Sequence, residues 1–525
     1  MATHAPATAP GRRTTGQMIA ISIFWLALNF HWQALNGLII TSQVLGLDYR
    51  EAPATGDAAA WVERVAPVTL AMVVVPGLLV ALISNPLFGL LSDRTQGRFG
   101  RRTPYILGGT ALNLVGLALM ALGPGAVIAG HSGSYFAPSI IVLTLGLMLT
   151  QVANNAAAAP FHALLPDMVP TAQRGTASGI MGIAQLLGAI GGALAPAFFG
   201  FNSRRLLDGT QSYADYNARL LSAYALVAVV VVALAIVSAL TVREGPYTRS
   251  PEAPTAPAGM ARMWGSLAGT MVVVTALVAL SVAGIRQFGH FGANADNDAT
   301  TIQVVQFIAV IVASIGAARA FEFRPRRHPD FSWVLATRLL AMMGIYIVYD
   351  FLTLYLQFVA HAPNPQGANA TFITILTLAA TLSTLIAGRA SDRLGRKRMV
   401  YISGGLMAVV GAAFIFAPIV VPGSILPVMY GAGAVFGIGY GAYLAVDWAL
   451  VADVLPSDAT YARDMGVWNM VFTIPGALAF VLGAWLIGLG ASLGSESLGY
   501  TLLFIAFALF ATLGTVTVRN IKGAT

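Results

Sequence analysis

Long apolar runs recur along the chain and are separated by short polar loops. About twenty apolar residues in a helix cross the hydrocarbon core of a bilayer, and runs of this length form two sets. The first set predicts helices over 17–45, 67–91, 104–124, 138–161, 177–200 and 221–242. The second predicts helices over 331–358, 370–390, 399–418, 425–450, 466–490 and 498–518. The pattern therefore predicts an all-α polytopic membrane protein with two six-helix halves.

Two further apolar segments lie between the halves, over 264–286 and 301–320. The first is strongly apolar, whereas the second contains Gln303 and Gln306. We favour a transmembrane hairpin, and so fourteen helices, over twelve helices with a surface insert. The expected organisation is a tail (1–16), a first half (17–242), a linker with the insert (243–330), a second half (331–518) and a tail (519–525).

Composition supports a lipid environment. The chain is 57% hydrophobic and 10% charged, so a folded form would expose apolar surface that only lipid can solvate. The basic residues stand in short clusters between apolar runs rather than along one polar face, which argues against a nucleic-acid partner. The chain has no cysteine, which excludes disulfides and thiolate metal sites.

The distribution of positive charge predicts the topology. Loops assigned to the cytoplasm hold 22 of the 29 Lys and Arg residues, the outside loops hold six, and Arg338 alone lies within a span. Because cytoplasmic loops carry an excess of positive charge, we expect both termini inside. We expect an integral protein of the cell membrane, in a bacterium the inner membrane.

Two loop motifs occur twice. Ser92-Asp93-Arg94 ends one apolar run and leads into a basic cluster, and Ser391-Asp392-Arg393 does the same in the second half. An Asp, a Pro and a later Arg follow the fourth helix of each half, with Asp167 and Arg174 in the first copy and Asp453 and Arg463 in the second. Duplicated halves with a binding site near the midplane are typical of secondary transporters.

With these repeats, the chain resembles the major facilitator superfamily, apart from its tails and insert. That family carries a Gly, Asp, Arg and basic-cluster signature after its second and eighth helices. The resemblance implies that the loop charges latch neighbouring helices at the cytoplasmic side, although they can also simply set topology. The resemblance implies this role for Asp93, Arg94, Asp392 and Arg393. Our further gating candidates in the repeated loops are Arg98, Arg101, Arg102, Asp167, Arg174, Arg396, Asp453 and Arg463.

The long first copy, from Ser92 to Pro104, is similar to plant sucrose/proton symporters and to the glycoside-pentoside-hexuronide symporters. Other stretches agree: Val152-Ala153-Asn154-Asn155, Asn85-Pro86, and Phe331, Trp333, Arg338, Gly344 and Tyr346. The resemblance implies a sugar or glycoside as substrate.

The chain differs from these carriers at positions where the carriers have a titratable or charged residue. Sucrose symporters have an Asp at the position of Gln151, and melibiose-type relatives have an Asp at that of Asn85. Sucrose symporters also have an Arg where this chain has His162. Because an amide does not titrate, the resemblance does not carry over proton or sodium coupling.

Polar residues within the spans fall on single faces of the first, fourth, seventh and tenth helices. In facilitators these helices line the central cavity, as the resemblance implies. Amides and hydroxyls bond to sugar hydroxyls, and aromatic rings stack on a pyranose, so the faces suit a neutral polyol. Interhelical contacts or plain packing are the alternatives. The candidate substrate-binding residues are Trp25, Asn29, Trp32, Gln33, Asn36, Gln151, Asn155, Tyr346, Thr353, Gln357, Tyr440 and Tyr443.

Asp350 is the most specific single candidate among the polar residues of the spans. It lies in mid-helix among apolar neighbours, and Arg338 is three turns away, too distant to pair. A carboxyl group away from water can take up and release a proton, so Asp350 is our candidate for proton coupling, with Asp447 and His31 as further candidates. The alternatives are a static hydrogen bond from a tyrosine to Asp350 and an interior, hydrogen-bonded His31.

We therefore expect a secondary transporter that moves a small polar solute, a sugar or glycoside, by alternating access. The alternatives are an exporter of amphipathic metabolites or drugs and, from another class, a membrane enzyme or sensor. An enzyme needs a compact catalytic cluster, but His31, His162 and Asp350 lie on different predicted helices. No phosphate-binding loop is present, and we expect no metal, no cofactor and a monomer.

Overall fold

The fold is that of a computed structural model, which describes residues 12–95, 100–128, 130–134, 136–170, 173–242, 265–270, 272–274, 295–320, 323–454 and 461–522. Within these ranges the regular structure is helical, without a β-strand. Thirteen of the described helices are long and apolar enough to cross a membrane. The prediction of an all-α membrane fold is therefore confirmed.

The first six predicted spans are all present. The first consists of α1 (Thr15–Ala34), a π-helical turn (Leu35–Ile39) and α2 (Ile40–Glu51). The others are α3 (Ala58–Arg94), α4 (Thr103–Val127), α5 (Pro138–Met168), α6 (Arg174–Ala197) and α8 (Tyr213–Thr241). A short helix, α7 (Ser203–Leu207), lies between α6 and α8.

The second six predicted spans also correspond to helices. These are α11 (Pro329–Phe358), α12 (Pro365–Leu394), α13 (Arg396–Val420), α14 (Ile425–Val454), α15 (Tyr461–Ser492) and α16 (Glu496–Thr517). The thirteenth candidate span is α10 (Ala295–Ala320), the second segment of the predicted insert. Of the first segment, the structure describes a short apolar helix, Gly265–Val274, which agrees with a hairpin.

Several helices begin earlier than hydropathy predicts, because polar or charged residues follow within their first two turns, such as Glu63 and Arg64 in α3 and Asp215 in α8. Asp57 caps α3 by accepting hydrogen bonds from the Ala59 and Ala60 amides, and Ser212 caps α8 at the Asp215 amide. Thr14 and Gln17 form a capping box at the start of α1. Such caps satisfy backbone N–H groups that the helix leaves unpaired.

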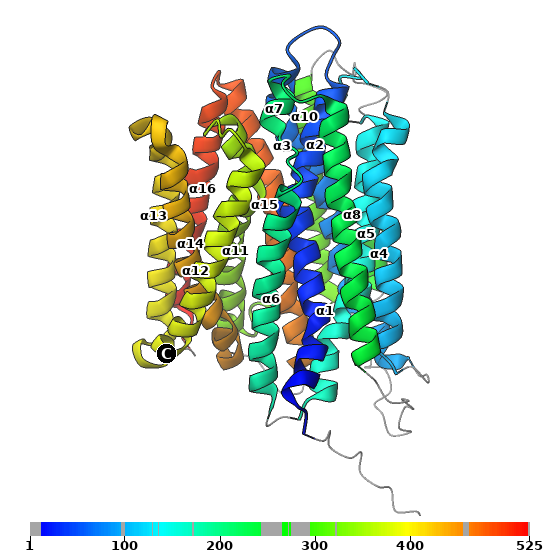
Figure 1. The fold of residues 1–525 in the computed structure, drawn as a ribbon. Helices are drawn as coiled ribbons and strands as arrows, with labels where there is room; N and C mark the ends of the chain where they lie inside the picture. Colours follow the sequence, from blue (N-terminus) through cyan, green and yellow to red (C-terminus); the bar gives the residue numbers. More distant parts are fainter. Residues whose placement is uncertain are drawn as a thin grey trace, which may run out of the picture.

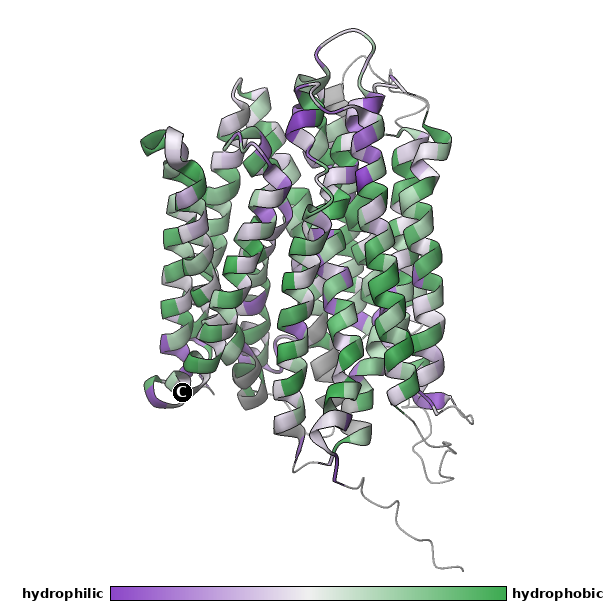
Figure 2. Cartoon of the chain, viewed as in Figure 1, coloured by the Kyte–Doolittle hydropathy of each residue, from purple (hydrophilic) through white to green (hydrophobic). Residues whose placement is uncertain are grey.

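The helices pack as two groups. Helices α1 to α8 contact one another, with α1 along α6 and α8 and α4 along α5, and α11 to α16 form the second group. The groups meet where α3 packs on α15 and α6 packs on α12 (Figure 1). Figure 2 shows apolar residues along the middle of the helices and polar residues gathered toward their ends.

Glycines allow the closest approaches within each group. A Cβ atom at Gly109 of α4 would lie 2.8 Å from the Ala153 carbonyl oxygen of α5. Gly188 and Gly192 of α6 face the backbone of α1, and Gly437 and Gly441 of α14 face that of α12, also without room for a Cβ atom. Larger side chains there would push these helix pairs apart.

Candidate functional site

The start of α1 and the C-terminal end of α16 lie at one end of the bundle, called here the inner end, and α7 lies at the opposite, outer end (Figure 1). At the outer end, polar side chains join the two groups. Gln366 Nε2 of α12 donates to Ser203 Oγ at 2.8 Å and to Ser42 Oγ at 3.2 Å. Ser203 Oγ in turn donates to Gln357 Oε1 of α11 at 2.6 Å.

Asn369 of α12 adds a second link between the groups. Its Nδ2 donates to the Gly37 carbonyl oxygen at 2.7 Å and to Thr353 Oγ1 at 2.7 Å. Gly37 lies in the π-helical turn of the first span, and such turns are frequent at functional sites. We call Ser42, Ser203, Gln357, Gln366 and Asn369 the outer seal. Its hydrogen bonds join neutral groups, each worth about 0.5–1.5 kcal/mol, so they can break without exposing a buried charge.

The face predicted on α11 therefore has two parts. Gln357 is buried as a member of the outer seal, and Thr353 is buried in contact with Asn369 of the seal. Nearer the middle, Tyr346 and Asp350 are half-buried. Asp350 Oδ2 has no hydrogen-bond partner among the described residues. The outer part of this face holds the groups together, and the middle part retains the free carboxyl oxygen of Asp350.

On the first span, some of the predicted substrate-binding side chains already contact other residues of the protein. Trp25 stacks on Phe161 of α5, with ring centroids 6.0 Å apart, and also contacts His162. Asn29 donates to the Trp25 carbonyl oxygen at 2.7 Å. Trp32 is 39% exposed, so its indole is the aromatic surface on this face that is most available for stacking. Gln33 and Asn36 are half-buried beside it in the sequence.

Gln151 and Asn155 of α5 lie in a contact with α3. Asn155 Oδ1 accepts a hydrogen bond from Asn85 Nδ2 at 2.9 Å, and Asn155 Nδ2 donates to the Gln151 carbonyl oxygen. The Gln151 side chain lies against Gly77, and its amide atoms have no partner among the described residues. The spacing of Gln151 and Asn155 predicts that they share one face of the helix, and the structure shows that this face meets α3.

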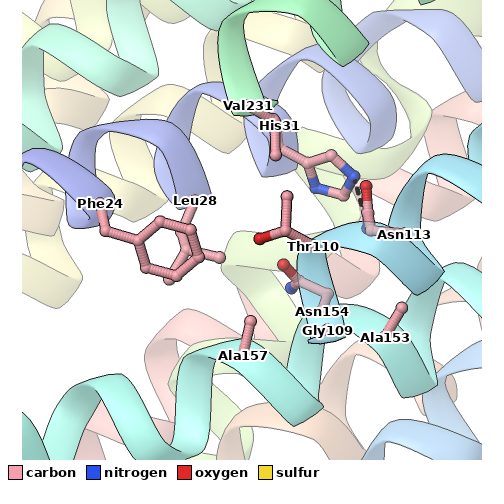
Figure 3. A pocket seen from close by; sticks show the side chains of 10 residues that line it. All are labelled: Phe24, Leu28, His31, Gly109, Thr110, Asn113, Ala153, Asn154, Ala157 and Val231. Atoms are coloured by element: carbon pink, nitrogen blue, oxygen red, sulfur yellow. Dashed lines mark hydrogen bonds between the residues drawn. The ribbon is translucent and has the colours of Figure 1, made fainter. Parts of the chain in front are cut away.

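His31 lies in a small pocket inside the first group of helices. The pocket is formed by α1, α4, α5 and α8 (Figure 3), and its polar lining is His31, Thr110, Asn113 and Asn154. His31 Nε2 is 3.2 Å from Asn113 Nδ2, and His31 Nδ1 has no partner among the described residues. His31 and Asp350 thus lie in different groups of helices.

A buried ion pair joins three helices of the second group. Arg338 of α11 pairs with Asp447 of α14, and their side chains are 0% and 3% exposed. Tyr443 donates to Asp447 Oδ1 at 3.1 Å. The Arg338 guanidinium also lies over the rings of Trp468 and Phe472 on α15, 3.6 and 4.1 Å from their centroids. Such contacts offset part of the cost of removing a cation from water.

Sequence reasoning missed this pair. It found that Arg338 is too far from Asp350, but it did not join Arg338 to Asp447. A usable signal was present, because a charge within a membrane span usually pairs with another buried group. Arg338 is the basic residue of the predicted span 331–358, and Asp447 is the acidic residue of the predicted span 425–450. Both spans are otherwise almost free of charged residues. The outer seal residues Ser42, Ser203, Gln366 and Asn369 were also missed.

At the inner end, the first loop motif forms an ion pair between α3 and α4. Arg102 lies 2.7 Å from Asp93 and donates to Ser92 Oγ at 2.7 Å. Arg102 is 3% and Asp93 54% exposed. Arg98 lies outside the described residues, as do the side chains of Asp167, Arg174, Asp392, Asp453 and Arg463. The gating roles of these residues and of Arg94, Arg101, Arg393 and Arg396 stay predictions.

Solved structures of membrane transporters share this fold. The nucleoside transporter NupG superposes with a TM-score of 0.61 and 13% identity, over 96% of this chain and 100% of NupG. A peptide transporter POT in complex with sulfate gives 0.62 and 15%, over 98% of each chain. The xylose transporter XylE from E. coli gives 0.58 and 12%, over 97% of this chain and 99% of XylE.

Curated relatives match part of the chain. Sucrose transport protein SUT2 of Oryza sativa subsp. indica is 30% identical over 188 residues, 34% of this chain and 37% of the rice protein. Sucrose transport protein SUC3 of Arabidopsis thaliana is 30% identical over 131 residues, 22% of each protein. The general alpha-glucoside permease of Schizosaccharomyces pombe is 29% identical over 126 residues, 23% of each. The matches span between 22 and 37% of the length of these relatives.

These matches confirm the resemblance to sucrose carriers that the loop and helix motifs indicated. A sequence model of the Major Facilitator Superfamily matches residues 14–420 and 338–521, nearly the whole chain. The chain belongs to the Major Facilitator Superfamily.

Proposed function

We propose that the protein is a secondary transporter that moves a sugar or glycoside across the membrane by alternating access. The observation that carries the proposal is the division of the polar face on α11. Its outer part is used to close the molecule, through Thr353 and Gln357. Its middle part, at Tyr346 and Asp350, is half-buried, and Asp350 Oδ2 there has no hydrogen-bond partner in the part of the chain that the structure describes. A ligand site beneath a closed gate has this form.

The chemistry of the site favours a neutral polyol. Arg338 and Asp447 neutralise each other, so the surroundings of Tyr346, Tyr440 and Tyr443 carry no net charge from this pair. Trp32 offers an exposed indole, which can stack on the apolar face of a pyranose. The names of the curated relatives, sucrose transport proteins and an alpha-glucoside permease, support the same substrate class.

Alternating access requires two gates. The outer seal closes one end with hydrogen bonds between neutral groups. At the other end, Asp93 and Arg102 tie α3 to α4 within the first group, and we assign to this link the positioning of α3 at the inner gate, where α3 meets α15, with the inner end facing the cytoplasm. Opening one end while the other closes would carry a substrate from side to side.

Proton coupling, where it occurs, is assigned to Asp350. Asp447 already pairs with Arg338, and a proton there would leave a buried guanidinium without its counter-charge. His31 bonds to Asn113 inside the first group, away from α11. Among Asp350, Asp447 and His31, only Asp350 lies on the face of α11 that meets the first group of helices. Its Oδ2 atom has no hydrogen-bond partner among the described residues.

Counterflow in proteoliposomes tests this function. Vesicles loaded with an unlabelled sugar should take up the same labelled sugar, and a panel of sucrose, methyl α-glucoside, xylose and a nucleoside should rank glucosides first. The sugar should be recovered chemically unchanged, which a membrane enzyme would not allow. Efflux of apolar cations with no sugar exchange would instead support the exporter alternative and contradict the proposal.

A further inference from the structure

The short helix α7 of the first group lies against the segment that joins α11 to α12 in the second group. Asn202, which caps α7, donates to the Pro363 carbonyl oxygen at 2.9 Å, and Ser203 contacts the outer seal. The next residue, Arg204, places its Nη1 atom 3.3 Å from Nδ1 of His361. Among the hydrogen bonds that join the two groups at the outer end of the described chain, this one alone involves a side chain that titrates near neutral pH.

The contact with Arg204 requires a neutral histidine. A guanidinium has only hydrogen-bond donors, so Nδ1 of His361 must accept, and the hydrogen of the imidazole ring must be on Nε2. Once Nδ1 takes up a proton it can no longer accept, and two positive charges face each other across this short distance. The contact is therefore present above the pH range in which histidine titrates, and it is lost as the pH falls through that range.

Two further charged residues belong to α7. Asp208 pairs with Nε of Arg204 at 3.2 Å and is 50% exposed, and Arg205 is also exposed. The carboxylate offsets part of the repulsion between Arg204 and a protonated His361, but solvent weakens so exposed a pair. The segment 359–369 has no other charged residue than this histidine. The charges of α7 therefore reduce the effect of protonation without cancelling it.

The helices that pack on α7 add no carboxylate that is free to pair with His361. These helices are α2, α8 and α12, and α12 has no charged residue before Arg389. The charged residues at the outer ends of α2 and α8 are Asp48, Arg50, Glu51, Asp215 and Arg219. Asp48 and Glu51 are buried, Arg50 lies over the ring of Tyr213, and the last two pair with each other.

The backbone of His361 shows that a histidine at this position has a conformational cost. Its φ is 47°, in the left-handed region that favours glycine. This conformation ends α11, where the Ala362 amide donates to the Leu356 carbonyl oxygen at 2.9 Å. Glycine would fit there with less strain, so the contact of the side chain with Arg204 offsets a cost. Because His361 is exposed and Arg204 is 34% exposed, solvent at the outer end reaches both.

We propose that Arg204 and His361 form a pH-sensitive contact that holds the outer end closed at neutral pH and releases it in acid. The proposal rests on the proposed alternating access, because it treats the outer seal as a gate. An acidic medium outside would open the sugar site to that side more often. The group that responds to pH in this way is separate from Asp350, to which proton coupling is assigned.

The labelling rate of a single cysteine measures how often the outer end opens. Gln33→Cys places a thiol one helical turn inside Gly37 of the outer contacts, and Thr55→Cys places one in an exposed outer loop. Each protein, in right-side-out membrane vesicles with equal pH inside and outside, is treated with a membrane-impermeant maleimide. Dividing the first rate by the second cancels the pH dependence of the thiol itself. We expect this ratio to be about fivefold higher at about pH 5 than at about pH 8.

Variants of the full-length chain assign the pH effect to this contact. His361→Asn keeps a hydrogen-bond acceptor and tolerates the left-handed backbone but does not titrate, so the ratio should be the same at both pH values. Arg204→Gln removes the positive charge and should reduce the effect to less than about twofold, and it serves where His361→Asn does not fold. The matched control is His131→Asn. His131 is also left-handed and exposed at the outer end, but it contacts Ala52 within the first group, so this variant should keep the full effect.

Failure of this inference can be told apart from failure of the proposed function. A ratio that does not rise in acid, with His361 and Arg204 in place, would overturn the pH-sensitive contact, and so would a full pH effect in His361→Asn. Counterflow of methyl α-glucoside in the same vesicles tests the proposed function by itself. Protein that shows the expected change in labelling but exchanges no sugar would contradict sugar transport and leave the pH-sensitive contact supported.

Discussion

The Arg338 guanidinium lies 3.6 Å from the centroid of the Trp468 ring while it pairs with the carboxylate of Asp447. One contact group thus ties α11, α14 and α15 together where neither charge meets solvent. Removing one member leaves the other charge buried and unpaired, at a cost of about 3–5 kcal/mol, whereas replacing both by apolar residues is often close to neutral.

We therefore expect Arg338→Met and Asp447→Leu each to lower the thermal stability of the purified protein markedly. The double variant Arg338→Met/Asp447→Leu should recover most of the loss. Thermal unfolding of the three variants beside wild type, arranged as a double-mutant cycle, measures the coupling. Two single variants as stable as wild type would show that the pair does not hold these helices together.

Loss of Asn369 should weaken the outer seal. Asn369→Ala removes the hydrogen bonds to the Gly37 carbonyl and to Thr353. Only the bond to Gly37 crosses between the two groups, and at about 1 kcal/mol for that bond the equilibrium should shift about fivefold toward an open outer end. Labelling of a single cysteine placed behind the seal, by a membrane-impermeant reagent, reports this shift. Thr374→Ala, whose hydroxyl bonds only within its own helix, is the control, and equal labelling of both variants would contradict the assignment.

Asp350→Asn should separate exchange from driven uptake. An amide of similar shape can keep the packing of the site but cannot take up or release a proton. Accumulation driven by a pH gradient should be lost, while counterflow at equal pH continues. The control is Asp215→Asn, an exposed carboxylate on α8 that pairs with Arg219 of the same helix. Undiminished accumulation by Asp350→Asn would remove it as the proton site.

The inner ion pair should affect the rate of transport more than binding of the sugar. Asp93→Asn leaves the nearly fully buried Arg102 without its carboxylate partner between α3 and α4. We expect slower counterflow with an unchanged inhibition constant for methyl α-glucoside, because the link lies at the inner end and away from the tyrosines. A large change in that constant, with a normal rate, would argue against a gating role.

Hydropathy located all twelve spans of the two halves because solvation by lipid is a property of each segment by itself. It placed the starts of α3 and α8 too late, since the charged residues of their first two turns, which follow the caps Asp57 and Ser212, lower the hydropathy there. Helical spacing correctly put Gln151 and Asn155 on one face. It had no information on which neighbour that face meets, and the answer is Asn85 and Gly77 of α3.

The contacts that define the candidate site depend on how distant helices are rotated against each other. Arg338 and Asp447 meet only because α11 and α14 turn these positions toward the same interior point. Ser203 and Gln366 are ordinary residues of a short helix and a helix end, and nothing in the local sequence marks them as a gate. Such pairings require the assembled bundle.

Crosslinking of the outer seal combined with sugar counterflow tests alternating access most directly. The natural chain has no cysteine, so Ser203→Cys/Gln366→Cys introduces the only two thiols, at positions whose side chains are now 2.8 Å apart. Counterflow of methyl α-glucoside should proceed in the reduced double variant, stop after treatment with a short reducible thiol crosslinker, and return on reduction. Counterflow that continues at the wild-type rate in the fully crosslinked protein would contradict the account.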